Sequence, residues 1–382
     1  MYSDKIKLFP IINTNIDLSN VEINYVSHNF PALGQLNYGY HQYLPQLYTN
    51  YNILINKYIE ENKNFFWIVS PYEITPLQNI DDPQKSNILI DTINNYLEYD
   101  KSISSLFLQM WEMLFSYKNF KLDIINYYIK ASQNDIISIE NAIKKYNNKI
   151  NKSKVSSKND KYNLCIYHNV FPNNNNMTLN ETYNFKQFYK GFLELIANLD
   201  DDGSMIIRIE DIFTKPSIKF LILCNYLFDA ISIYKPNYSR LVDNEKFLIC
   251  SKFKLKEYNK ISFKLNKNFN KIDVNEYIID IFPDVIIDKN FENNIKYINS
   301  ILSGIVYVEK NKVMTYIKSE NYYGADYDNY CKQQEISVNN FLSIFFPMNN
   351  DDFKQSHQII SKNLEQTITY INNYNQNGIV NF

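Results

Sequence analysis

Glycine is scarce in this chain, with 7 residues among 382, and none occurs between Gly39 and Gly191. Loops that wrap a nucleotide or a related cofactor rely on glycine, because only a residue without a side chain lets the backbone approach the ligand closely. A glycine-rich cofactor loop is therefore excluded between residues 39 and 191.

Cysteines are also few, and the four of them lie far apart in the sequence. Cys165, Cys224 and Cys250 fall in apolar segments, and no pair has the short spacing of a zinc site. We expect reduced thiols, no disulfide framework and no metal site, as in an intracellular protein.

Long apolar runs are missing as well, since none approaches the roughly 20 residues that a membrane helix needs. The N-terminal sequence MYSDKIKLFPII does not have the shape of a signal peptide. The sequence therefore predicts no membrane span and a cytoplasmic location.

The overall charge gives no sign of a nucleic-acid-binding protein, because the formal net charge is −2 and the isoelectric point is near 6.2. Apolar residues make up 45% of the chain and aromatic residues 16%, which is enough for a large core. The length suits one large domain with additions, or two domains. Asparagine, isoleucine, lysine and tyrosine dominate, as an AT-rich genome produces, so the asparagine runs carry little functional weight.

The stretch 203–253 has the clearest structural signal. Residues 205–209 form an apolar run after the turn sequence Asp-Asp-Asp-Gly, which predicts a buried strand. Pro216 suits the first turn of a helix, where its missing N–H costs nothing. Apolar runs at 230–234 and 247–250 predict two more strands. Strands that are apolar on both faces and separated by a helix are typical of the interior of an α/β sheet.

Periodicity predicts the other elements. Apolar residues recur at three- and four-residue spacing in the predicted helices 48–62, 88–99, 103–117 and 181–199. Strands are predicted at 21–26, 65–69 and 163–167. The pattern of residues 123–161 predicts a helix followed by a lysine-rich loop, and the pattern from residue 274 onward is helical.

Two strings carry a family resemblance, GSMIIRIED at 203–211 and YKPNYSRLVDNEKFLICSKFK at 234–254. They resemble the end of FtsJ-like methyltransferase domains, closest to the cap 2′-O-methyltransferases of large nucleocytoplasmic DNA viruses. FWIVSPYE (66–73), SSLFLQMWEM (104–113) and NYYGADYDNYCKQQ (321–334) resemble further segments of that family. The resemblance implies a degenerate, Rossmann-like methyltransferase domain over 65–255, an N-terminal region, 1–64, and a mainly helical extension, 256–382.

The resemblance also implies where a catalytic site would lie. The family transfers a methyl group to a ribose 2′-oxygen with a Lys-Asp-Lys-Glu tetrad, whose central lysine is thought to take the hydroxyl proton. The corresponding positions here are Gln109, His168, Arg208 and Glu245, so only the glutamate is kept. Arginine stays protonated at any working pH and cannot act as the base.

The family's cofactor loop, which contains a Glu-x-Pro-Gly-Gly-like sequence, would fall within 123–161, where there is no glycine. We therefore expect no bound S-adenosylmethionine and no catalysis. The chain would be a structural or accessory subunit, with a protein partner or self-assembly, in a virion or an mRNA-processing complex of the host cytoplasm or a viral factory. Two alternatives stay open: an active RNA cap 2′-O-methyltransferase that binds S-adenosylmethionine, and an RNA-binding accessory subunit.

Two lysine-rich tracts support the RNA-binding alternative. One contains Lys152, Lys154 and Lys158, and the other contains Lys252, Lys254 and Lys256. In the family fold both tracts would border the strand ends where RNA lies, and lysine contacts to phosphates give salt-dependent affinity. Lysine runs from an AT-rich genome are also commonly a solvated face.

Structural roles compete with functional roles at several of these residues. A histidine at a strand end, such as His168, is commonly a structural hydrogen-bonding group. Arg208 and Glu245 together fit a buried ion pair that holds two strands in register. The acidic residues 200–202 fit a solvated turn, and Trp111 fits the core.

Overall fold

The computed structural model describes residues 7–31, 38–60, 87–98, 103–116, 126–151, 161–170, 180–209, 211–319 and 324–377. The predicted strand 65–69, the FWIVSPYE segment, and Lys152, Lys154 and Lys158 lie outside the described residues.

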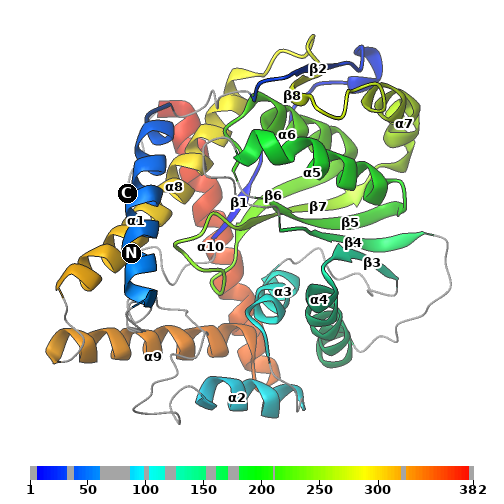
Figure 1. The fold of residues 1–382 in the computed structure, drawn as a ribbon. Coiled ribbons are helices and arrows are strands. Elements are labelled where there is room, and N and C mark those ends of the chain that lie inside the picture. Colours follow the sequence, from blue (N-terminus) through cyan, green and yellow to red (C-terminus); the bar gives the residue numbers. More distant parts are fainter. Residues whose placement is uncertain are drawn as a thin grey trace.

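A six-stranded sheet forms the centre of the molecule (Figure 1). Its order is β1 (Lys7–Pro10), β6 (Phe228–Lys235), β7 (Lys246–Phe253), β5 (Leu199–Ile209), β4 (Tyr162–His168) and β3 (Tyr127–Ala131). β3, β4 and β5 are parallel, whereas β7 is antiparallel to both β5 and β6, and β1 is antiparallel to β6. Four strands therefore point the same way, which confirms an α/β fold.

The alternation of side chains along the strands explains why both faces of the sheet are covered. On β5, Met205 and Ile207 pack into one core cluster, whereas Ile206 packs into the other. All three side chains are fully buried. A strand that is buried on both faces needs a continuous apolar run, and this is the pattern that predicted it.

Two layers of helices enclose the sheet (Figure 1). α5 (Asn180–Ile196) and α6 (Lys215–Leu227) cover one face, and α3 (Ser105–Ser116) and α4 (Gln133–Tyr146) cover the other. Pro216 lies in the first turn of α6, as the sequence predicts, and Thr214 caps the helix. Trp111 of α3 is fully buried, so its predicted place in the core is confirmed.

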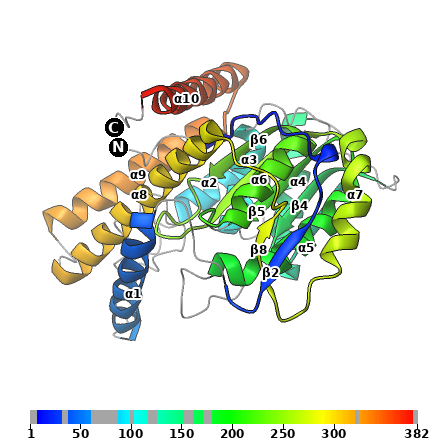
Figure 2. The same cartoon turned by 90° about the horizontal axis from the view of Figure 1, so that it is seen from above.

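The other described elements extend this three-layer body. The helices are α1 (Tyr38–Glu60), α2 (Asn87–Leu97), α7 (Leu255–Phe269), α8 (Lys289–Ser319), α9 (Ala325–Phe345) and α10 (Asn350–Asn377). A 3-10 turn, η1 (Leu18–Asn20), precedes β2 (Tyr25–His28), which pairs with β8 (Tyr277–Ile281) in a second sheet, and a π turn, η3 (Asn147–Asn151), follows α4. Figure 2 shows α1, α8, α9 and α10 at the end of the molecule opposite α7.

Three sequence-based predictions need correction. The segment 123–161 is not wholly helical, because residues 127–131 form β3 before Ser132 caps α4. The segment after residue 274 begins with β8 rather than with a helix. Residues 200–202 are exposed as predicted but belong to β5, where Asp202 has φ = 59°. β3 and β8 are short and make long-range pairings, which local periodicity does not record.

No helix in the described ranges is long and apolar enough to cross a membrane.

Candidate functional site

The four positions that the resemblance selects lie together at one edge of the sheet. His168 ends β4, Arg208 is the penultimate residue of β5, and Glu245 directly precedes β7, whose first residue pairs with Ile209. Gln109 reaches the same point from α3. The carboxyl ends of parallel strands form the edge at which α/β proteins bind ligands.

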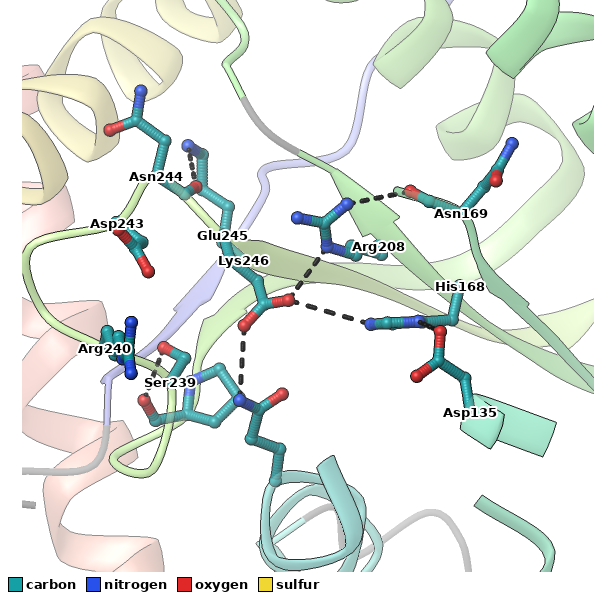
Figure 3. Close-up of polar contacts among 12 residues, drawn as sticks. Asp135, His168, Asn169, Arg208, Ser239, Arg240, Asp243, Asn244, Glu245 and Lys246 are labelled. Atoms are coloured by element: carbon teal, nitrogen blue, oxygen red, sulfur yellow. Dashed lines mark hydrogen bonds and ion pairs between the residues drawn. The ribbon is translucent and has the colours of Figure 1, made fainter. Parts of the chain in front are cut away.

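Arg208 and Glu245 form an enclosed ion pair (Figure 3). Arg208 Nε donates to Glu245 Oε1 at 2.8 Å, and Nη1 donates to the carbonyl oxygen of Asn169 at 2.8 Å. The two side chains are only 11% and 19% exposed. The predicted contact between the two strands is therefore confirmed, and it connects the ends of β4, β5 and β7.

Gln109 donates a further hydrogen bond to Glu245. Its Nε2 donates to Glu245 Oε2 at 3.2 Å and lies 3.3 Å from the carbonyl oxygen of Tyr238. Both carboxylate oxygens of Glu245 therefore have a protein partner. A neutral amide makes this contact where the resemblance has a lysine.

His168 joins the network through a residue that the sequence analysis missed. Its Nδ1 lies 3.2 Å from Asp135 Oδ2, and its Nε2 lies 3.7 Å from Glu245 Oε1 (Figure 3). The imidazole is buried and stacks on the ring of Phe247. Asp135 is in the first turn of α4, where Ser132 accepts from its N–H. The Ser-x-x-Asp spacing of a capping box was the available signal, but it predicts only a helix start.

The electrostatics of the site favour an ionised glutamate. Burial by itself would raise the pKa of Glu245, but His168 and the positive charges of Arg208 and Lys235 lower it to about 2. The carboxylate is therefore charged at neutral pH. This charge balances the fixed charge of the guanidinium.

Lys235 fixes the loop that carries Glu245. The Nζ group of this buried lysine donates to the carbonyl oxygens of Arg240, Asp243 and Glu245 at 2.8–3.0 Å. Burial lowers the pKa of Lys235 to about 7, against the opposing charges of Glu245 and Asp243. The YKPNYSR string thus folds around its own lysine, which positions the glutamate.

A second buried carboxyl group supports the same loop from α3. Glu112 accepts hydrogen bonds from the Tyr234 hydroxyl at 2.8 Å and from the backbone N–H of Asn237 at 2.9 Å. Burial raises the pKa of Glu112 to about 7, although these hydrogen bonds oppose the shift. Gln109 and Glu112, three residues apart on one helix, therefore both contact the loop between β6 and β7.

The carboxyl end of β3 does not reproduce the cofactor loop that the resemblance implies. β3 leads through Ser132 alone into α4, and the carboxylate of Asp135 is directed toward His168 (Figure 3). Without glycine in this connection the backbone has no position freed for close approach of a ligand. This connection therefore differs from the cofactor loop that the resemblance implies.

A small cavity of about 50 Å³ lies beside Arg208, between the start of α5 and the start of α6. Asn169, Asn184 and Phe188 are among the residues that line it. Within the described ranges, no group of three or more histidine, cysteine or acidic residues could hold a metal ion.

The second lysine tract is not at this edge. β7 runs from the site toward the opposite edge, and Lys252 and Lys254 lie at that far end, just before α7. Leu255 N–H donates to Asp201 at the beginning of β5, which confirms this placement. The expectation that Lys252, Lys254 and Lys256 border the site was wrong, because β7 is antiparallel to β5.

Comparison with known proteins gives limited but consistent similarity. No family model matches the chain. Over 132 residues it is 26% identical to cap-specific mRNA (nucleoside-2′-O-)-methyltransferase 1 of Trypanosoma cruzi (strain CL Brener), covering 32% of this chain and 34% of the relative. Over 138 residues it is 28% identical to the inactive cap-specific mRNA (nucleoside-2′-O-)-methyltransferase 1B of Caenorhabditis briggsae. This match covers 34% of this chain and 16% of the relative. The matches thus span about a third or less of these relatives. They relate about a third of this chain to cap-specific mRNA 2′-O-methyltransferases.

Proposed function

We propose that this chain has a methyltransferase fold but does not transfer methyl groups, and that it acts as a structural or accessory subunit of a larger assembly. The observation that carries the proposal is Arg208, which stands where the resemblance has the lysine base. Its guanidinium is bound by Glu245 and by the Asn169 carbonyl. A guanidinium stays protonated in proteins, so it cannot take the proton of a ribose hydroxyl.

Further support comes from the rest of the network. Gln109 supplies no charge, and no glycine occurs in the connection from β3 to α4. One of the relatives is itself named inactive. As part of the same proposal, the assembly is a virion or an mRNA-processing complex of viral type, in the cytoplasm or a viral factory.

Calorimetry with S-adenosylmethionine and a methyl-transfer assay on capped RNA test this proposal together. We expect no heat of binding at millimolar cofactor and no labelled RNA. Arg208→Lys should not restore transfer, because Gln109 and His168 also differ from the tetrad. A saturable isotherm with micromolar affinity, accompanied by transfer that Glu245→Ala abolishes, would show that the chain is an enzyme.

One observation favours the alternative of an active enzyme. Asp135 binds Nδ1 of His168, while Nε2 has no hydrogen-bond partner among the described residues. A carboxylate that orients a histidine is a common arrangement for a general base. Transfer would then require Nε2, which is buried in this structure, to become accessible to the 2′-hydroxyl, and Glu245, 3.7 Å away, would stabilise the resulting imidazolium. His168→Gln would then abolish methyl transfer.

A further inference from the structure

A row of lysines follows the solvent-facing side of α7, remote from the network around Glu245. Lys256, Lys260, Lys264 and Lys267 occur at three- and four-residue spacing, and Lys271 lies about one turn beyond. All five are exposed. At 3.6 residues per turn the four lysines of α7 fall within an arc of about 80°, so they form one continuous stripe along the helix, and Lys271 lies in the turn that follows it.

An exposed aromatic ring lies beside this stripe. Phe263 is 73% exposed, and Lys267 Nζ lies 5.7 Å from the centre of its ring. Three exposed asparagines, Asn259, Asn266 and Asn270, continue the same side of the helix. Phe263 therefore lies outside the core, among exposed lysine and asparagine side chains.

Carboxylates neutralise only the beginning of the stripe. Glu257 pairs with Lys260 at 2.7 Å. Among the described residues, no carboxylate forms an ion pair with Lys264, Lys267 or Lys271. The second half of α7 therefore presents an unbalanced positive charge on a chain whose net charge is −2.

We propose that this face of α7 binds single-stranded RNA, with the lysines on successive phosphates and a base stacked on Phe263. A positive track combined with an exposed aromatic ring is how proteins bind single strands without sequence preference. A membrane fits less well, because the apolar side of α7, which includes Ile261 and Leu265, is buried against the body and cannot enter lipid. Figures 1 and 2 both show α7 at the outer end of the molecule, where a strand could approach it.

Fluorescence anisotropy with a labelled 20-nucleotide poly(U) strand tests the proposal on the full chain. We expect salt-dependent binding, and at least tenfold weaker binding by Lys264→Gln/Lys267→Gln/Lys271→Gln, with a salt dependence reduced by about two ions. Phe263→Ala should weaken binding about fivefold or more without changing the salt dependence. The matched control Lys289→Gln/Lys354→Gln/Lys362→Gln removes the same charge from exposed sites on α8 and α10 and should stay within twofold of the parent.

Several results would overturn the proposal: no binding by the parent at low salt, equal weakening by the control variant, or binding to phosphatidylserine vesicles without binding to RNA. Melting curves of each variant show that loss of binding is not loss of folding. The experiment does not involve S-adenosylmethionine, so its failure would leave the proposed function unaffected.

Discussion

At the scale of single residues, the contact between Arg208 and Glu245 dominates the site. Both side chains are largely enclosed, so neither charge is well solvated without the other. Breaking such a pair leaves an uncompensated charge, which costs roughly 3–5 kcal/mol when burial is complete. We expect Glu245→Ala to lower the free energy of unfolding by about 2–4 kcal/mol.

A double-mutant cycle measures this coupling. Arg208→Met, Glu245→Leu and the variant with both substitutions form the cycle. The double variant should be more stable than either single variant, with a coupling energy of about 1–3 kcal/mol by urea denaturation. A coupling energy near zero would mean that water reaches the pair and that it has no structural role.

The pH dependence of stability gives a second prediction for Glu245. Its pKa in the folded protein is about 2, below the ordinary value of 4.5, so the folded state favours the ionised form. This stabilisation is complete above the ordinary pKa and is lost as the pH falls from about 4.5 to 2. The loss corresponds to a contribution on the order of 3 kcal/mol.

Glu245→Gln isolates this effect, because the amide resembles the protonated acid. The difference in unfolding free energy between parent and Glu245→Gln should be largest above pH 5 and should shrink toward zero near pH 2. Glu335→Gln, at an exposed position on α9, is the control and should differ little from the parent throughout. A difference that is independent of pH would contradict the low pKa.

At the scale of elements, the packing of α5 on β4 depends on Gly191. A Cβ atom at this position would overlap the ring of Tyr167, which is itself buried. We expect Gly191→Ala to destabilise the protein by about 1–3 kcal/mol through overpacking. Gly304→Ala on α8 is the matched control, because its Cβ would meet no atom within 4 Å. This control should stabilise the helix by about 0.5–1 kcal/mol. Thermal melting that ranks the two variants in the opposite order would exclude close packing at Gly191.

At the scale of the whole molecule, elements outside 65–255 complete both cores. Phe282 and Ile295 belong to the cluster on the α5 and α6 face, and Phe345 and Phe346 belong to the cluster on the α3 and α4 face. Trp111 Nε1 also donates to the carbonyl oxygen of Phe345 at 2.8 Å. We therefore expect a fragment limited to 65–255 to show no cooperative melting by circular dichroism, whereas the full chain does. A cooperatively melting fragment would show that the resemblance marks an independent domain.

The sequence predicted the strands and helices whose own apolar pattern records their burial. β5, β6 and β7 follow from local apolar runs, and α6 follows from Pro216 and the helix expected between two of these strands. The contact between Arg208 and Glu245 was also predictable, because the resemblance placed both residues on neighbouring strands. These features depend on the apolar pattern of short segments or on the two strings, 203–211 and 234–254, that carry the family resemblance.

Other features were decided only by the tertiary structure. Asp135 meets His168, 33 residues later, because β3 and β4 are parallel and end at the same edge, and no sequence spacing encodes that contact. Lys252 and Lys254 lie far from Glu245 because β7 extends between them, and its antiparallel pairing places them beside the beginning of β5 rather than its end. The apolar pattern of a segment specifies its own burial, whereas strand order and direction determine which polar ends meet.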